Sequence, residues 1–245
     1  CEIGLRPIDL HVYAVKRLGA TVQENFGKLY FEAPNWMRGE KITLSFPSVG
    51  ATENAILSCV AAKGTTVIVN AAREPEIVDL CNFLDKCGAD VKGAGESIIT
   101  IKGVGKLNGT EHTVISDRIV AATYLAAGAV TGGSVELLNV NPVHLNAVLP
   151  VFEEMGCEIR VRCSTVRLKA VGRLNRVDKI ITQPYPGFPT DSQALFTVLA
   201  SVANGTSVIV ENLFANVPAR RKFLKKDITE ASSVTAVVEK IALSH

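Results

Sequence analysis

Hydrophobic and polar residues form a long pattern that recurs along this chain. Each copy combines an apolar helix, a glycine turn, a short β-branched run, a loop and a second helix. The copies are AAKGTTVIVNAAREPEIVDLCNFLDKCGADV, GAVTGGSVELLNVNPVHLNAVLPVFEEMGCEI and SVANGTSVIVENLFANVPARRKFLKKDIT. Glycines at matching places, Gly19, Gly88 and Gly156, follow one another at intervals of 69 and 68 residues. This spacing indicates an internal repeat of roughly 70 residues.

Apolar residues inside the repeats fall at i, i+3, i+4 and i+7, the spacing of one face of a helix. These positions are Ile77, Leu80, Cys81 and Leu84, then Leu145, Val148, Leu149 and Phe152, then Leu195, Val198, Leu199 and Val202. Pro75 and Pro142 stand where two of these helices are expected to begin. Gly88 and Gly156 stand where they are expected to end.

A pair of short β-branched runs follows each repeat and predicts a hairpin. The pairs are ADVKGAGESIITIKGV, CEIRVRCSTVRLKAV and, more weakly, ASSVTAVVEKIAL. GAGES joins two strands, so we interpret it as a turn rather than a phosphate loop. The repeating unit is therefore β-α-β-α-β-β, an α/β fold. The segment 111–118, EHTVISDR, interrupts the rhythm and predicts a boundary between domains at 1–114 and 115–245.

Composition narrows the class of protein. The chain has 245 residues, of which 47% are hydrophobic and 20% charged, as in a globular protein of one or two domains. A net charge of +2 is too small to indicate binding to nucleic acid or to an anionic membrane. No apolar run reaches the length of a membrane span. The six cysteines show no C-x-x-C spacing, so a zinc site is unsupported and most are expected to be buried free thiols in a reducing cytoplasm.

Three stretches carry candidate chemistry beyond the repeat. In CEIGLRPIDLH, residues 1–11, Asp9 could simply cap a helix. In FPSVGATEN, residues 46–54, a loop of small residues runs into a helix N-terminus, which favours an anion, although a capping box ending at Glu53 would explain the same letters. In PYPGFPTDSQA, residues 184–194, stiff residues surround Asp191, which could also be a cap.

Taken together, these stretches resemble the UDP-N-acetylglucosamine 1-carboxyvinyltransferases, the enolpyruvyl transferases that open bacterial peptidoglycan synthesis. NAAREPEIVDLCNFL and ISDRI add to the resemblance, which extends from Cys1 to about Asn212. It implies an inside-out α/β barrel of two domains, each built from three repeats. It also implies transfer of the enolpyruvyl group of phosphoenolpyruvate to the 3′-hydroxyl of UDP-N-acetylglucosamine, with release of phosphate. The resemblance implies neither a metal nor an organic cofactor.

The resemblance assigns roles to residues of this chain. Cys1 matches the reactive thiol that protonates phosphoenolpyruvate and that fosfomycin alkylates, and Arg6 matches an arginine near the phosphate. Asp191 matches the carboxylate that acts as base at the 3′-hydroxyl; a stiff turn would fix it before substrate arrives. The substrate-binding residues that the resemblance implies are Arg6, Pro7, Ile8, Asp9, Leu10, Ser48, Val49, Gly50, Asp191 and Leu213.

Several departures leave alternatives open. The segments before Cys1 and after the last repeat are not matched, and Phe46 and Val217 stand where basic residues are expected. We therefore expect a fragment or a truncated relative, with low activity if the chain is complete. One alternative is a catalytically silent protein that binds UDP-N-acetylglucosamine, and such incomplete domains would favour self-association. Another is the transferase that acts on shikimate 3-phosphate, although RPIDLH and PGFPTD argue against it.

Overall fold

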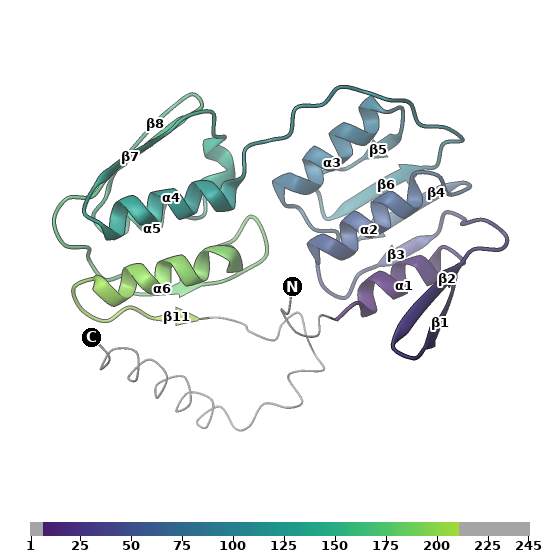
Figure 1. Ribbon diagram of the computed structural model, residues 1–245, viewed down its shortest axis with the longest axis horizontal. Coiled ribbons are helices and arrows are strands. Elements are labelled where there is room, and N and C mark those ends of the chain that lie inside the picture. The colour runs from purple at the N-terminus through teal and green to yellow at the C-terminus, as the bar shows by residue number, and fades with distance from the viewer. Residues whose placement is uncertain (1–6, 211–245) are drawn as a thin grey trace. The chain divides into compact units, whose positions relative to one another are not determined.

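A computed structural model describes residues 7–210 (Figure 1). The predicted site residues Cys1, Arg6 and Leu213 lie outside the described residues, as do the second helix of the third repeat and the strand pair expected after it. Two clusters of buried hydrophobic residues divide the described chain, one over 14–101 and one over 121–203. We call these regions the first half and the second half.

The first half contains one complete repeat. Its elements are α1 (Asp9–Arg17), β1 (Thr21–Asn25), β2 (Lys28–Glu32), β3 (Lys41–Thr43), α2 (Val49–Cys59), β4 (Thr65–Val69), α3 (Pro75–Lys86), β5 (Asp90–Lys92) and β6 (Ile98–Lys102). From β3 to β6 the order is β-α-β-α-β-β, which confirms the predicted unit. The four strands form one sheet in the order β3-β4-β6-β5, with β3 parallel to β4 and the other pairs antiparallel. Strands β1 and β2 form a separate hairpin.

The predicted apolar face of α3 is confirmed. Ile77 and Cys81 are fully buried, Leu84 is buried, and Leu80 packs partly buried against the same core. Pro75 is the first residue of the helix, where its missing N–H costs no intrahelical bond. Gly88 follows the helix with a φ of +98°, the left-handed conformation that glycine adopts without strain. Local sequence therefore determines both ends of this helix.

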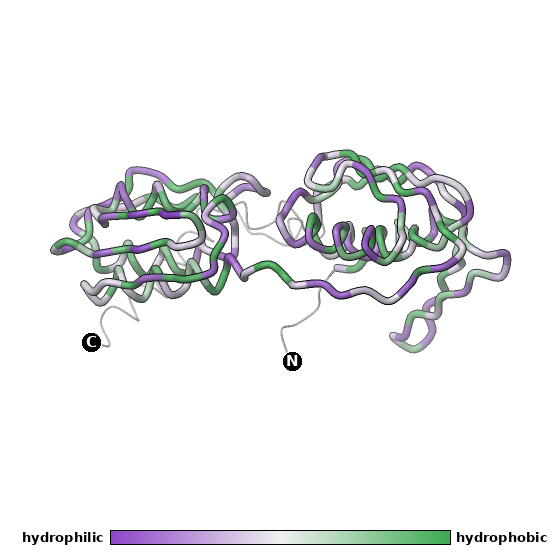
Figure 2. Tube along the Cα trace, turned by 90° about the horizontal axis from the view of Figure 1, so that it is seen from above, coloured by the Kyte–Doolittle hydropathy of each residue, from purple (hydrophilic) through white to green (hydrophobic). Residues whose placement is uncertain are grey.

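The second half contains the same unit in a more broken form. Its elements are α4 (Arg118–Val130), β7 (Ser134–Leu137), the 3-10 turn η1 (Pro142–Leu145), α5 (Leu149–Glu154), β8 (Glu158–Arg162), β9 (Thr165–Lys169), β10 (Ile180–Ile181), the 3-10 turn η2 (Thr190–Ser192), α6 (Gln193–Val202) and β11 (Ile209–Val210). Strands β7, β9 and β8 form an antiparallel sheet, and β10 pairs with β11 in parallel. The two predicted hairpins, β5–β6 and β8–β9, are confirmed, and polar and apolar residues alternate along the latter (Figure 2).

Two predictions about helices of the second half were wrong in part. The four predicted positions are buried, namely Leu145, Val148, Leu149 and Phe152, but the chain there forms η1 and α5 rather than one helix. Pro150 accounts for the break, because it has no N–H to donate to the carbonyl four residues earlier. In α6 the core positions are Phe196 and Leu199, whereas Val198 is 55% exposed. Val202, also predicted on the apolar face, is 42% exposed.

The segment from 103 to 117 joins the halves without a helix or strand (Figure 1). His112 lies in it, and its Nε2 is 3.0 Å from Oδ1 of Asp79 on α3. This segment overlaps the interruption of the repeat that was expected at 111–118. The domain boundary between residues 114 and 115 stays a prediction. Across residues 7–210, every helix is too short or too polar to span a bilayer.

The cysteines that the structure describes are free thiols. Four of them are buried, as predicted, and Cys163, in the turn between β8 and β9, is exposed. Burial raises the pKa of Cys59 and of Cys81 to about 11, so these two thiols stay protonated at neutral pH. Neither has the character of a reactive cysteine.

Candidate active site

Helix α2 begins at the loop that the sequence predicted for a diphosphate. Ser48 is the N-cap, and its Oγ accepts a hydrogen bond of 3.4 Å from the backbone N–H of Ala51. Val49 and Gly50 are the first two residues of the helix, where backbone N–H groups point outward and favour an anion. The capping-box interpretation was wrong, because the residue three places after the cap is Ala51 and not Glu53.

Helix α1 begins beside this helix N-terminus. Its N-cap is Ile8, without a side-chain bond, so the interpretation of Asp9 as the cap was wrong. Asp9 is instead the first helical residue, and it is exposed. His11 faces α2, with its Nδ1 3.0 Å from Nδ2 of Asn54. A Cβ at Gly50 would lie 3.3 Å from Cε1 of His11, so the glycine permits this approach.

The two predicted binding segments, 7–10 and 48–50, therefore lie at the N-termini of packed helices. Electrostatic interactions continue from there to α3. Burial raises the pKa of Glu53, the charge of Glu76 raises it further, and His11 lowers it. The pKa of Glu53 therefore depends on the charges of His11 on α1 and Glu76 on α3.

Asp191 lies in the short turn η2, directly before α6. The N-caps of η2 and α6 are Pro189 and Ser192, and neither makes a side-chain capping bond. The interpretation of Asp191 as a helix cap was therefore wrong. Its side chain is 49% exposed. Backbone bonds fix the preceding stretch, because the N–H of Gln183 donates to the carbonyl of Phe188 at 2.8 Å.

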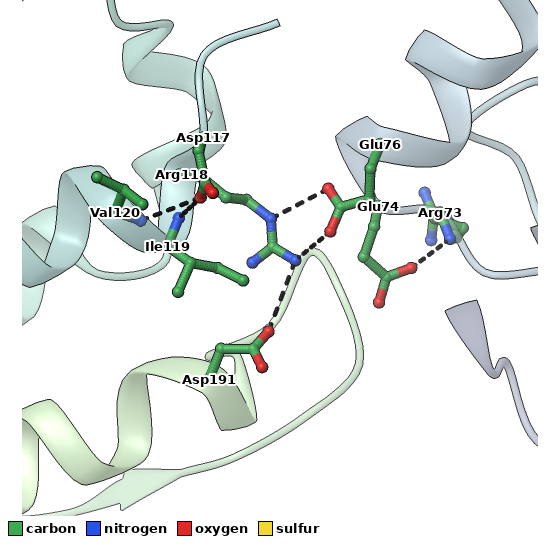
Figure 3. A network of polar contacts seen from close by, with 8 residues as sticks. All are labelled: Arg73, Glu74, Glu76, Asp117, Arg118, Ile119, Val120 and Asp191. Carbon is green, nitrogen blue, oxygen red and sulfur yellow. Dashed lines mark hydrogen bonds and ion pairs between the residues drawn. The ribbon is translucent and has the colours of Figure 1, made fainter. Parts of the chain in front are cut away.

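Arg118 brings Asp191 and Glu76 together (Figure 3). Its Nη2 lies 2.7 Å from Oε1 of Glu76, and its Nε lies 3.3 Å from Oε2 of the same carboxylate. The Nη2 atom also lies 3.9 Å from Oδ2 of Asp191. Only 9% of the Arg118 side chain is exposed. Its guanidinium carbon is 6.0 Å from the ring centroid of Tyr185, which belongs to the same stiff turn as Asp191.

Burial alone would lower the pKa of Arg118. The hydrogen bond and charge of Glu76, together with the charges of Asp191 and Glu74, outweigh burial, so the pKa of Arg118 rises above its usual value. Arg118 is consequently a permanent cation between carboxylates from α3 and η2.

Sequence reasoning missed the residues that link the predicted ones. Arg118 stands in the quoted ISDRI segment, but nothing in its spacing pairs it with Glu76, 42 residues earlier. His11 and Asn54 are separated by 43 residues and were equally invisible as a pair. Over residues 7–210, no group of three or more histidine, cysteine, aspartate or glutamate residues is arranged to hold a metal ion.

Comparison with known proteins establishes the family. A sequence model of the family described as EPSP synthase (3-phosphoshikimate 1-carboxyvinyltransferase) matches residues 1–227. This chain belongs to that family. The predicted membership among the enolpyruvyl transferases is confirmed.

Curated relatives share the name that the motifs suggested. The chain is 53% identical over 216 residues to UDP-N-acetylglucosamine 1-carboxyvinyltransferase 1 of Symbiobacterium thermophilum, and the match covers 88% of this chain and 49% of the relative. It is 50% identical over 216 residues to the protein of that name from Caldanaerobacter subterraneus subsp. tengcongensis, covering 88% and 52%. The chain thus spans about half the length of these relatives.

Solved structures of two family members show the fold. The enolpyruvyl transferase NikO from Streptomyces tendae superposes with a TM-score of 0.74 at 21% identity, covering 89% of this chain and 55% of that one. EPSP synthase from Acinetobacter baumannii gives a TM-score of 0.60 at 24% identity, covering 83% and 48%. The predicted enolpyruvyl-transferase α/β fold is confirmed.

Proposed function

We propose that this chain carries the site for transfer of the enolpyruvyl group of phosphoenolpyruvate to the 3′-hydroxyl of UDP-N-acetylglucosamine, with release of phosphate. The relatives of that name support the proposal. The placement of Asp191 carries it: a half-exposed carboxylate in a stiff turn, without a capping role and facing a buried cation. A carboxylate placed in this way can contact a substrate, because it is not used to cap a helix.

In this proposal Asp191 removes the proton of the attacking 3′-hydroxyl, and Cys1 supplies a proton to C3 of phosphoenolpyruvate. Arg6 lies near the phosphate. Residues 7–10 hold the uridine, residues 48–50 receive the diphosphate and Leu213 contacts the nucleotide sugar. The shared location of the first two segments at packed helix N-termini supports this division of roles.

The proposal extends to biological setting and assembly. The reaction would serve bacterial cell-wall synthesis in the cytoplasm, and hence cell shape and division, with Cys1 as the point of attack of fosfomycin. We propose domains at 1–114 and 115–245, each completed by further repeats. Without such completion, exposed apolar residues such as Val198 would favour self-association, which gel filtration measures.

A second candidate function is binding of UDP-N-acetylglucosamine without turnover. The observation that favours it is the pair of helix N-termini of α1 and α2, which suit an anion and by themselves supply no group for proton transfer. Transfer to shikimate 3-phosphate is a third candidate, which the description of the family supports.

Phosphate release tests these candidates. The chain is incubated with phosphoenolpyruvate and either UDP-N-acetylglucosamine or shikimate 3-phosphate, beside the variants Cys1→Ala and Asp191→Ala. We expect release only with the nucleotide sugar, and a loss of roughly 10²–10⁴-fold when the base is removed. Release with shikimate 3-phosphate alone would overturn the proposal. Calorimetric binding of the nucleotide sugar without release would instead establish the silent binder.

A further inference from the structure

The position of Arg118 is unfavourable for its own helix. Arg118 is the first residue of α4, and the N-terminal turn of a helix carries a partial positive charge that repels a cation. The cap itself is complete without it, because Oδ1 of Asp117 accepts hydrogen bonds from the N–H groups of Ile119 at 2.7 Å and Val120 at 3.0 Å. Helix stability therefore does not explain an arginine at this place.

The surroundings of the guanidinium give a better explanation. Glu76, in the first turn of α3, engages Nε and Nη2 together, which fixes the plane of the guanidinium (Figure 3). Nη2 also lies 3.9 Å from Oδ2 of Asp191, which is too long for a hydrogen bond but within the range of an ion pair. Asp191 is thus oriented by charge while both of its oxygens stay free of a hydrogen bond from Arg118.

We propose that Arg118 is a positioning residue that aims the Asp191 carboxylate at the substrate hydroxyl, with Glu76 as its fixed anchor. Helix α4 packs against η2 and α6, so the arginine and the aspartate move as one unit. The inference rests on the proposed function, in which Asp191 is the base. Arg118 itself touches no reacting atom in this scheme.

The test compares kcat and KM for the variants Arg118→Ala, Asp191→Ala and the double variant. We expect Arg118→Ala to lower kcat about 100-fold, the cost of a misplacement of about 1 Å. The KM for UDP-N-acetylglucosamine should stay within about twofold, since binding energy is untouched. The double variant should be no slower than Asp191→Ala alone, because Arg118 acts through Asp191.

Three further variants separate positioning from folding. Arg118→Lys keeps the charge and should recover much of kcat, which a purely structural defect would not predict. Glu76→Gln keeps one acceptor oxygen but removes the second acceptor and the anchoring charge, and its kcat should lie between those of the wild type and Arg118→Ala. Arg176→Ala removes an arginine from an exposed pair with Asp178 (3.1 Å) and is the matched control without effect. Circular dichroism confirms that each variant is folded.

The failures are distinguishable. An active wild type with an unchanged kcat in Arg118→Ala, or with only a raised KM, overturns this inference and leaves the proposed function intact. A wild type that releases no phosphate refutes turnover, and the same variants are then compared by calorimetric affinity for UDP-N-acetylglucosamine. Equal weakening in Arg118→Ala, Asp191→Ala and the double variant supports positioning, and additive weakening overturns it. A chain that neither releases phosphate nor binds UDP-N-acetylglucosamine refutes both the proposed function and this inference.

Discussion

Residues 75–86 of the first half form one continuous helix, whereas the matching residues of the second half form η1 and the short helix α5. The buried positions nevertheless correspond, since Leu84 and Phe152, 68 residues apart, both lie in a core. The apolar positions are therefore buried in both halves, although the backbone conformation differs. The repeat thus conserves the buried positions in both halves, whereas the proline determines whether the backbone between them is one continuous helix.

The halves also differ in what their helix starts contribute to the candidate site. The first half supplies the starts of α1 and α2, which suit the anionic part of a nucleotide sugar. The second half supplies Asp191, the proposed base, and the cation Arg118 beside it. The ion pair between Arg118 and Glu76 makes the surroundings of Asp191 depend on a residue of the first half. In the proposed function, the anion-binding helix starts and the base Asp191 would therefore come from different halves, which the ion pair between Arg118 and Glu76 links.

The largest expected effect tests whether the two cores unfold separately. Phe152 is fully buried and packs at 4.8 Å between ring centroids on Phe196, so Phe152→Ala should cost about 3–5 kcal/mol of unfolding free energy. Leu84→Ala is the matched variant in the first half, with an expected cost of about 2–5 kcal/mol.

Two probes make this test specific. Trp36 is the single tryptophan of the chain and lies in the first half, so its fluorescence in urea reports that half. Circular dichroism reports both. We expect Phe152→Ala to shift the circular dichroism transition and to leave the fluorescence transition in place. Equal shifts of both probes would show that the halves unfold as one unit.

Helix caps provide the next comparison. Asp117 caps α4 with two hydrogen bonds, whereas Ser48 caps α2 with one long bond. We expect a loss of about 1–2 kcal/mol for Asp117→Ala and about 0.5 kcal/mol for Ser48→Ala, measured by urea denaturation. Asp117→Asn keeps the capping oxygen and should cost little. A larger loss at Ser48 than at Asp117 would contradict this ranking.

Glu74 distinguishes the halves by pH. It is buried before Pro75, and burial raises its pKa above 4.5, with Glu76 adding to the rise, while backbone hydrogen bonds and Arg118 oppose it. The residue before Pro142 is the neutral Asn141, which caps η1. Because the native state holds the Glu74 proton more tightly, stability falls as the pH rises from 4.5 through the raised pKa. Glu74→Gln should remove this slope.

Urea titrations at several pH values measure the effect. Glu74→Gln should exceed the wild type in unfolding free energy at neutral pH and match it below pH 4.5, where Glu74 is protonated in both states. Glu40→Gln is a control at an exposed glutamate. An equal difference at every pH would indicate a packing effect instead.

The smallest effect concerns thiols and leaves stability unchanged. In a Cys1→Ala background, Cys163 of the second half should react rapidly with a disulfide reagent such as DTNB, since it is exposed. Cys59 and Cys81 of the first half should react only on unfolding, because they are buried and their pKa is raised to about 11. Cys163→Ala should abolish the rapid phase. A rapid phase that persists would place another thiol at the surface.

The sequence by itself determined the repeat, the order of elements from β3 to β6 and the turn at GAGES. Each of these depends on a local signal: an apolar period, a proline at a helix start, or a glycine with positive φ. The motifs also determined the family, because long segments of matching letters do not require knowledge of the contacts. The same local signals failed in α6, where Val198 fits the apolar period but is 55% exposed.

Only the tertiary structure decided what the charged residues do. The sequence suggested that Asp9 and Asp191 cap helices. Neither does, because the N-caps of α1 and α6 are Ile8 and Ser192. Arg118 acquires its partners from 42 residues before it and from Asp191, well after it in the sequence. Such pairs form because helices pack against one another. Contacts between residues far apart in the chain produce no periodic pattern in the sequence. Local rules therefore predict elements, whereas the environment of a charge depends on long-range packing.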